Sequence, residues 1–268
     1  MKPLLVTGGI GSTGKAILVT EGKIAEFLSV DGGEIYGIAQ GHGFYFVAVR
    51  GQSRKVLKLD SKLKTVCYST LPQTADPHCI YIESGVVHVI SSSEDLIYKF
   101  TMDLDFIGRD VFGFGGDKRF HTNDVTKIGS EFFVSMFTDQ QDGNWNADVG
   151  QGFVKSGSTV NPLDMKSEFT GLCKPHNPVL FKDDLWVCDS GRGSVWCNNS
   201  KVYQEQGTWS RGLCVEDDFI HIGMSDYSRA GKSKLVTLTR SGDVVREVVL
   251  PLGFIYGITV DGRSDSVI

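Results

Sequence analysis

Residues whose side chains can do chemistry recur along this chain at the starts of apolar segments. Three are histidines, which serve as general bases near neutral pH or as ligands of transition metals. One is an arginine, whose guanidinium holds a carboxylate, sulfate or phosphate through two parallel hydrogen bonds. Two are tyrosines, which can donate a hydrogen bond from a hydroxyl. In chain order these residues are Tyr36, His78, His121, His176, Arg211 and Tyr256.

Acidic and amide side chains accompany these residues. Asp76 precedes His78 by two positions, Asn123 and Asp124 follow His121, and Asn177 follows His176 directly. Carboxylates beside a histidine orient it for proton transfer, while amide and imidazole groups together are common metal ligands. Asp189 ends a later strand-like segment, where it could bind substrate or cap a turn.

A repeat explains why these residues are spaced as they are. Each unit begins with a polar or aromatic residue, continues as an apolar strand, turns within two or three residues and enters a second apolar strand. Unit starts at Tyr36, His78, Asn123, His176, Arg211 and Tyr256 are separated by 35 to 53 residues, with a mean of 44. A four-stranded propeller blade takes about 40 to 50 residues.

The two ends of the chain complete each other. The last repeat stops after one strand, at Asp261-Gly262, whereas Pro3–Thr7, Lys15–Thr20 and Lys23–Val30 are three predicted strands that lack a first one. We therefore predict an all-β, six-bladed β-propeller that spans residues 1–268 as a single domain. Its last blade is closed by three N-terminal strands and one C-terminal strand, which removes the exposed sheet edges.

In such a ring the first strand of every blade lines a central channel, and all first strands begin on one face. The unit starts are therefore predicted to converge at the channel mouth, where Arg211, Tyr36, Tyr256 and Asp189 would bind substrate. The long polar loop Thr138–Gly150 belongs to the same face, and its single Trp145 could cover the mouth.

Composition narrows the classes of function. The chain is 41 % hydrophobic and 22 % charged, and its net charge of −5 argues against binding of nucleic acid. No apolar run reaches the roughly 18 residues of a membrane span, and the N-terminal apolar stretch is too short for a secretory signal, so we expect a cytoplasmic protein. The six cysteines lie mostly inside apolar strands and are expected to be free thiols; the alternative is a Cys188–Cys197 bridge across a hairpin.

One motif resembles a phosphate-binding loop. Gly9-Ile-Gly-Ser-Thr-Gly14-Lys15 has the spacing GxxxxGK, but Ala16 stands where the loop needs Ser or Thr for Mg²⁺. The residues that follow favour a hairpin over the helix that would hold phosphate. We expect no nucleotide cofactor.

Two segments carry a family resemblance. FHTNDVTKIGSEFFVSMFTD and HNPVLFKDDLWVCDSGRGSVW resemble blades of the gluconolactonase, regucalcin and strictosidine-synthase-like group of six-bladed propellers. The second segment, with TWSRGLCV, is still more similar to a bacterial propeller family that has a PHxP, WVCDSGRG and RGL pattern and no established activity. The lactonase resemblance implies a divalent cation such as Ca²⁺, held by a Glu, two Asn and an Asp; Asn123 and Asn177 match the asparagines, whereas Arg211 replaces the carboxylate.

Two chemistries fit this set of residues, and both make the protein an enzyme acting on a small anionic carboxylate or sugar-type substrate. In the first, His78 and His176, with His121, Asn123 or Asn177, hold Zn²⁺ or Mn²⁺ for hydrolysis or lyase chemistry. In the second there is no metal: a histidine paired with Asp76 or Asp124 is the base, and Arg211 stabilises negative charge for elimination or epimerisation.

A different class of function also fits. A non-catalytic propeller would use the same face to bind a protein, peptide or glycan, with aromatic side chains as stacking surfaces. The aromatic residues available for this are Trp145, Trp196, Trp209 and Tyr227.

Overall fold

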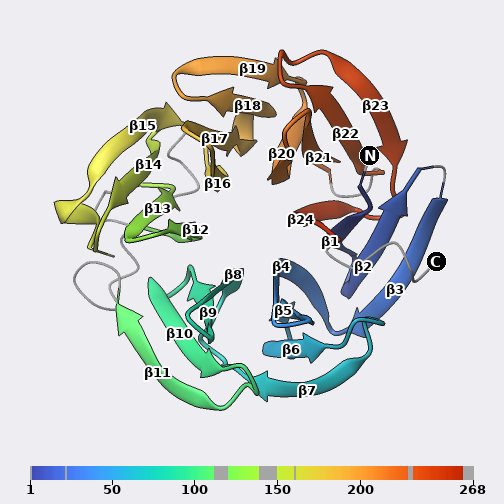
Figure 1. Cartoon of the computed structure of the whole chain (residues 1–268), viewed down its shortest axis with the longest axis vertical. Coiled ribbons are helices and arrows are strands. Elements are labelled where there is room, and N and C mark those ends of the chain that lie inside the picture. The colour runs from blue at the N-terminus through green and yellow to red at the C-terminus, as the bar shows by residue number, and fades with distance from the viewer. Residues whose placement is uncertain are drawn as a thin grey trace.

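Four-stranded antiparallel sheets, arranged around a central opening, make up the protein (Figure 1). A computed structural model describes residues 2–21, 23–111, 120–138, 150–159, 161–228 and 232–261. Within each sheet the strands step outward from the opening, which is the architecture of a β-propeller. The all-β propeller fold predicted from the repeat is confirmed.

Four of the sheets use consecutive strands. They are β8 (Pro77–Glu83), β9 (Val86–Ser91), β10 (Leu96–Thr101) and β11 (Phe106–Val111); β12 (Thr122–Ile128), β13 (Glu131–Met136), β14 (Gly152–Gly157) and β15 (Lys166–Leu172); β16 (Pro175–Phe181), β17 (Asp184–Asp189), β18 (Ser194–Cys197) and β19 (Ser200–Gln204); and β20 (Thr208–Val215), β21 (Phe219–Asp226), β22 (Lys234–Thr239) and β23 (Val244–Val249).

The remaining strands are joined into one larger sheet. One half contains β24 (Phe254–Val260), β1 (Leu4–Ile10), β2 (Thr13–Thr20) and β3 (Lys23–Asp31), and the other contains β4 (Gly33–Gly41), β5 (Phe44–Gly51), β6 (Lys55–Leu59) and β7 (Thr65–Thr70). A single parallel residue pair, Thr13 with Gly33, connects the halves. The first and last strands of the chain, β1 and β24, pair antiparallel over most of their length.

Burial decreases from the middle strands to the outer ones. Strand β5 is buried over five consecutive residues, Tyr45 to Val49, because neighbouring sheets cover both of its faces. The outermost strands β7, β11 and β23 alternate exposed and half-buried residues, since only one face packs inward. This gradient explains why the second and third strands of each unit are apolar runs in the sequence.

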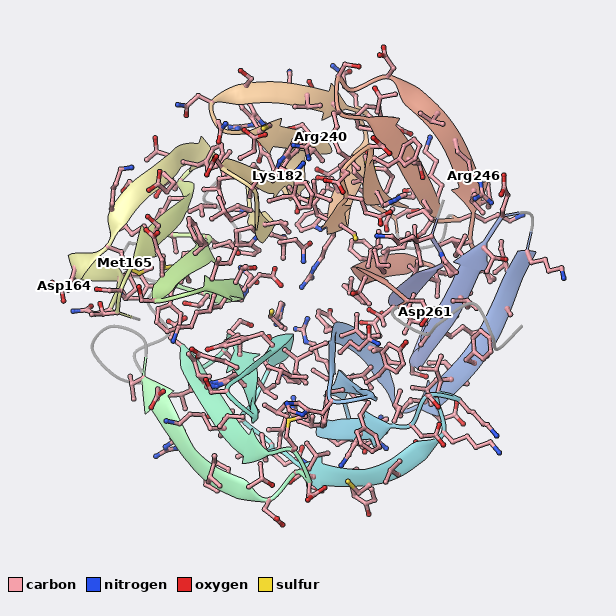
Figure 2. All side chains as sticks on the ribbon, in the orientation of Figure 1. Asp164, Met165, Lys182, Arg240, Arg246 and Asp261 are labelled. Atoms are coloured by element: carbon pink, nitrogen blue, oxygen red, sulfur yellow. The ribbon has the colours of Figure 1, made fainter. Side chains whose placement is uncertain are left out.

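The core consists of apolar clusters that lie between neighbouring sheets. Phe46 and Val56 pack with Val87 and Tyr98, for example, and Trp186 packs with Leu213 and its neighbours. Side chains fill the space between the sheets around the whole ring (Figure 2). Burying a side chain of this size stabilises the fold by roughly 1.5 to 3 kcal/mol, so these interfaces hold the sheets in place.

The structure also shows the state of the cysteines, the conformation of the GxxxxGK motif and the extent of helix. All six cysteines are free thiols, as expected, and the alternative Cys188–Cys197 bridge is wrong because the register places Cys188 opposite Val195 and Cys197 opposite Trp186. The residues of the GxxxxGK motif form the antiparallel hairpin β1–β2. Helix in the described part of the chain is limited to the 3-10 turns Pro162–Asp164 and Ser190–Arg192, and neither is long and apolar enough to cross a membrane.

Candidate functional site

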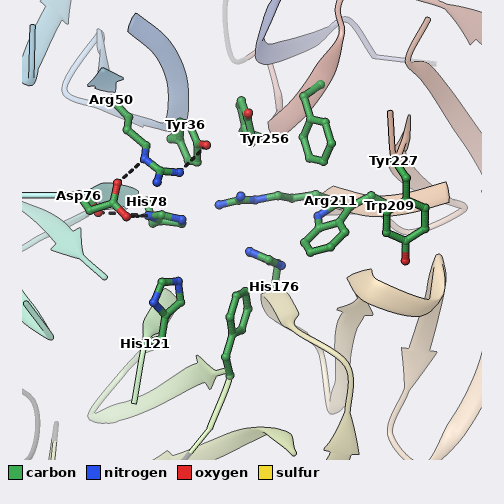
Figure 3. A pocket seen from close by; sticks show the side chains of 12 residues that line it. Tyr36, Arg50, Asp76, His78, His121, His176, Trp209, Arg211, Tyr227 and Tyr256 are labelled. Atoms are coloured by element: carbon green, nitrogen blue, oxygen red, sulfur yellow. Dashed lines mark hydrogen bonds and ion pairs between the residues drawn. The ribbon is translucent and has the colours of Figure 1, made fainter. Parts of the chain in front are cut away.

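A pocket of about 220 Å³ lies at the central opening, where the inner strands β4, β8, β16, β20 and β24 begin (Figure 3). Its walls combine aromatic rings, imidazoles and two guanidiniums with a single carboxylate. The lining residues are Tyr36, Arg50, Asp76, His78, His121, Phe137, His176, Trp209, Arg211, Tyr227, Phe254 and Tyr256.

β-Bulges present the inner-strand residues to the channel. In β4, β8, β12 and β24 the neighbouring strand skips one residue, and these residues are Tyr36, His78, Asn123 and Tyr256. In β20 the irregularity covers Arg211 and Gly212. A bulged residue leaves the ladder and its side chain is re-aimed. The bulges therefore explain how Tyr36, His78 and Tyr256 come to face the axis, whereas the bulged Asn123 does not line the pocket.

Eight aromatic and imidazole rings form a closed belt around the pocket. Adjacent ring centroids lie 3.8 to 6.1 Å apart, from the stacked Tyr36–Tyr256 pair at 3.8 Å to Trp209–Phe254 at 6.1 Å. In order around the pocket the rings belong to Tyr36, His78, His121, Phe137, His176, Trp209, Phe254 and Tyr256. Ring contacts of this kind fix the shape of the wall before any ligand binds.

Arg50 is a fully engaged cation at one edge of the belt. Its Nη1 donates to the Tyr36 hydroxyl at 2.6 Å, and its Nε contacts the carboxylate of Asp76. Asp76 also accepts a hydrogen bond from Ser92 Oγ at 3.0 Å. Burial raises the pKa of Asp76, an effect that Arg50 opposes. Arg50 and Asp76 thus neutralise each other within the pocket wall.

His78 and His176 are held in matching ways. Nδ1 of each ring lies near the backbone carbonyl two residues earlier, at 3.1 Å for His78 and 3.0 Å for His176. A serine hydroxyl also contacts each Nδ1, Ser92 at 2.8 Å and Ser190 at 2.9 Å. A ring that donates from Nδ1 to a carbonyl presents an unprotonated Nε2. Both imidazoles can therefore offer a lone pair to a bound molecule.

Burial keeps these imidazoles neutral. Burial first, and then the positive charge of Arg211, hold the pKa of His78 and of His176 well below the ordinary value. Burial, with help from Arg50 and Arg211, lowers the pKa of His121 to about 3. At neutral pH the belt therefore adds no positive charge to the pocket.

Arg211 occupies the centre of the site. Its side chain reaches across the pocket toward His78 and is only 4 % exposed (Figure 3). The guanidinium carbon lies 5.0 Å from the ring centroids of both Tyr36 and Tyr256, which are cation–π distances. Among the described residues no carboxylate lies within ion-pair distance of Arg211, and its Nε and Nη2 have no hydrogen-bond partner. A buried charge without a partner is costly, so an anion is expected beside it.

The structure brings together many of the predicted site residues, but places others elsewhere. Tyr36, His78, His121, His176, Arg211 and Tyr256 all line the pocket. Trp145 and most of the predicted covering loop lie outside the described residues. Asn123, Asp124, Asn177 and Asp189 are absent from the pocket wall.

Asn123, Asp124 and Asn177 lie behind that wall, where they bind backbone groups and one another. The fully buried Asn123 donates from Nδ2 to the His121 carbonyl, and its Oδ1 has no partner. Asp124 accepts from the backbone N–H of Asn177 at 3.1 Å, and Asn177 Oδ1 accepts from the Gly212 N–H at 2.7 Å. This chain of bonds ties β12, β16 and β20 together. Burial raises the pKa of Asp124, although Arg211 opposes it.

Asp189, expected to bind substrate, instead holds a turn. Its carboxylate accepts from the Cys173 N–H at 2.6 Å and from Arg192 Nη1 at 3.1 Å, and the residue is completely buried. One carboxylate oxygen is therefore bound to the backbone ahead of β16, and the other to the side chain of Arg192 in the 3-10 turn that follows β17.

The expected metal site stays a prediction. Within the part of the chain that the structure describes, no three His, Cys, Asp or Glu side chains are grouped so that they could hold a metal ion. His78 and His121 have ring centroids 5.9 Å apart, but the Asn123 side chain binds the His121 carbonyl and the Asn177 side chain binds Asp124 of the neighbouring strand β12.

Sequence reasoning missed Arg50, Phe137 and Phe254, and considered Trp209 and Tyr227 only as stacking surfaces. The sequence contained a signal that could have placed two of these residues at the pocket. Trp209 precedes Arg211 by two positions and Phe254 precedes Tyr256 by two, just as Asp76 precedes His78. Residues two apart in a strand share a face. Arg50, Phe137 and Tyr227 follow the ends of second strands or lie in them, where the repeat pattern carries no such mark.

The fold and the site together define a β-propeller with a ligand-sized pocket at its axis. Residues 113–243 match the family described as a domain of unknown function, DUF4915. No curated protein matches the chain.

Solved structures that resemble the chain are propellers of low sequence identity. A protein of unknown function from Bacteroides caccae superposes with a TM-score of 0.69 at 14 % identity, over 96 % of this chain and 98 % of that one. A chain of a nidogen/laminin complex gives 0.69 at 10 % identity, covering 95 % and 97 %. A streptogramin B lyase gives 0.54 at 13 % identity, covering 81 % and 69 %. At these identities the likeness concerns the fold alone.

Proposed function

We propose that the central pocket binds a small organic anion through Arg211 and moves a proton on the carbon next to its carboxylate, without a metal ion. The observation that carries this proposal is the buried Arg211 guanidinium with Nε and Nη2 unpartnered. Nε and Nη2 form the side of a guanidinium whose N–H bonds run parallel, and this side matches the two oxygens of a carboxylate.

Proton transfer is supported by the neutral histidines. Nε2 of His78 or His176 takes the proton from the carbon beside the carboxylate, and the resulting negative charge is stabilised by Arg211. Return of the proton to the opposite face gives epimerisation, whereas departure of a neighbouring group gives elimination. Because Arg211 depresses both pKa values, an anion that offsets its charge raises them and makes the imidazoles better bases.

The test separates binding from chemistry. Lactate, malate and tartrate are incubated with the protein in D₂O, and loss of the proton beside the carboxylate is followed by NMR while binding is measured by calorimetry. We expect exchange that is lost in His78→Gln or His176→Gln and binding that is lost in Arg211→Met. Binding without exchange would refute the catalytic part, and equal binding by Arg211→Met would refute the site.

We also infer six blades, with the last one closed by both ends of the chain. Two observations support this count: β2 and β4 share only one residue pair, and an apolar cluster lies between each pair of neighbouring four-stranded units. Leu5 and Thr259 are directly paired across β1 and β24. A disulfide that forms in the Leu5→Cys/Thr259→Cys double variant would agree with this closure, and its absence under oxidising conditions would contradict it.

The proposed chemistry differs from the chemistry that the resemblance to the gluconolactonase group implies. Arg211 stands where that group would place a carboxylate ligand, and a guanidinium repels a cation.

A further inference from the structure

A second cavity opens beside the central pocket. It has a volume of about 710 Å³, and charged and polar side chains contribute to its wall. The lining residues are Arg50, Gly51, Gln52, Arg54, Gln73, Thr74, Ala75, Asp76 and Ser93. Arg50 and Asp76 belong to both walls, so the two cavities share an edge.

Arg54 gives this cavity a positive charge that is not neutralised locally. Its Nη1 donates to the Gln73 side-chain oxygen at 2.9 Å, and its buried Nε has no partner. Among the residues that the structure describes, Asp76 is the one carboxylate that lines these two cavities, and it is already bound to Arg50.

Two acids next to these walls are also committed. Glu34 accepts hydrogen bonds from the Tyr256 hydroxyl at 2.9 Å and from the Tyr36 hydroxyl at 3.5 Å. Glu94 accepts hydrogen bonds from Thr74 at 2.7 Å, from Ser91 at 2.9 Å and from Tyr98 at 2.8 Å, so its carboxylate is turned toward these hydroxyls. Three guanidiniums therefore face one lining carboxylate across the connected cavities. Coulombic attraction in such a partly enclosed, positively charged space favours a ligand that carries more than one negative charge.

We propose that the natural ligand is an elongated dianion, with one carboxylate at Arg211 and a second anionic group, carboxylate or phosphate, at Arg54. This inference rests on the proposed function, because it takes the first carboxylate to be at Arg211. Such a ligand would cross the edge formed by Arg50 and Asp76, the residues that line both cavities. Linking two anionic groups in one molecule makes the second contact intramolecular, so the gain appears only when the linker matches the separation.

The test compares matched monoanions and dianions by calorimetry. Hexanoate, heptanoate and octanoate are measured against adipate, pimelate and suberate, and 6-phosphonohexanoate serves as the phosphorus counterpart of pimelate. At one chain length we expect the dianion to bind at least ~10-fold more tightly than the monoanion, the scale of one charged hydrogen-bonded contact. Whichever of the two end groups gives the larger gain identifies the second anionic group.

Three variants test which residues give dianions their higher affinity. Arg54→Met is expected to bring the ratio of dianion to monoanion affinity to about one while leaving the monoanion affinity unchanged. Arg54→Lys keeps the positive charge but loses the planar guanidinium, so it should retain part of the higher affinity for dianions. Partial retention would show that the loss in Arg54→Met is not caused by misfolding. Arg109→Met, on the outer strand β11, is the control and should behave as the wild type.

The same measurements distinguish a failure of the proposed function from a failure of the second subsite. If Arg211→Met binds monoanions as the wild type does, or if the wild type binds neither class, the proposed function is wrong and this inference falls with it. If Arg211→Met loses binding, but dianions show no advantage at any length or keep it in Arg54→Met, only the second subsite is wrong.

Discussion

The two ends of the inner strands treat charge in opposite ways. At the hairpin ends, cations meet carboxylates: Lys182 pairs with Asp217 at 2.8 Å and Arg240 with Asp184 at 3.0 Å. At the channel end, Arg211 is nearly inaccessible and lies among aromatic rings with no carboxylate in ion-pair distance among the described residues. Charge at the hairpins is neutralised in pairs that stay largely in contact with solvent, whereas the unneutralised charge of Arg211 is buried at a cost. That cost is the physical sign of a binding function.

Arg211→Met is expected to have the largest effect. We expect affinity for monocarboxylates to fall ~10- to 100-fold, because a charged hydrogen-bonded contact is lost. The free energy of unfolding of the ligand-free protein should rise by about 1 kcal/mol, because an unpaired buried charge is replaced by an apolar side chain. Calorimetric binding and urea unfolding measure the two effects. A variant that is less stable than the wild type would contradict the idea that Arg211 strains the empty protein.

The next test concerns the residues behind the wall. In Asn177→Ala the Gly212 N–H loses its partner and the Asp124 carboxylate keeps only the backbone N–H, so the free energy of unfolding should fall by about 1 to 3 kcal/mol. The measurement is repeated with Zn²⁺, Mn²⁺ or Ca²⁺ added. A loss of stability that depends on the metal would restore the interpretation of Asn177 as a metal ligand.

How far sequence reasoning reached can be seen in these same strands. The repeat placed Tyr36, His78 and Arg211 correctly, because strands of similar length in successive blades must begin at the same face. It did not reveal that Asn123 and Asn177 lie behind the pocket wall, because both sit where the inner strands are irregular and apolar alternation does not reveal a bulge. In β12 the pocket position belongs to His121 instead, two residues earlier and in the left-handed region at φ 47°.

A smaller effect is expected from pH. His78 and His176 have depressed pKa values when folded, so the unfolded chain binds protons that the folded chain does not once the pH falls below about 6.5. Folded-state stability should therefore decrease as the pH falls from 7 to 5, and His176→Gln should gain stability relative to the wild type over this window. A constant difference between the two proteins, measured by urea unfolding at each pH, would show that His176 is not held neutral.

Affinity for an anion should increase as the pH falls, whereas folded-state stability decreases. An anion at Arg211 offsets the charge that depresses both histidine pKa values, so the complex takes up protons and affinity for hexanoate increases as the pH falls from 7 to 5.5. Calorimetry in buffers of different ionisation enthalpy counts the protons. In the His78→Gln/His176→Gln double variant we expect this uptake to disappear.

Lys182→Met is expected to have the smallest effect on stability and affinity. Lys182→Met removes the cation of a highly exposed ion pair at the hairpin end, where both partners remain solvated. Thermal unfolding and monocarboxylate affinity should both match those of the wild type. A clear loss of affinity would mean that the two ends of the inner strands are coupled, and the distinction drawn between them would fail.

The pairing of β1 with β24 has a consequence for how the protein is made. Thr7 and Gly257, which are in contact, are 250 positions apart, so β1 leaves the ribosome long before its partner exists. Until then one edge of β1 is open to other nascent strands, a situation that favours aggregation and calls for chaperone protection. Tyr256 arrives with that late strand, so a chain cut short upstream of it lacks part of the aromatic belt. Production of an intact site is thus linked to completion of translation through β24.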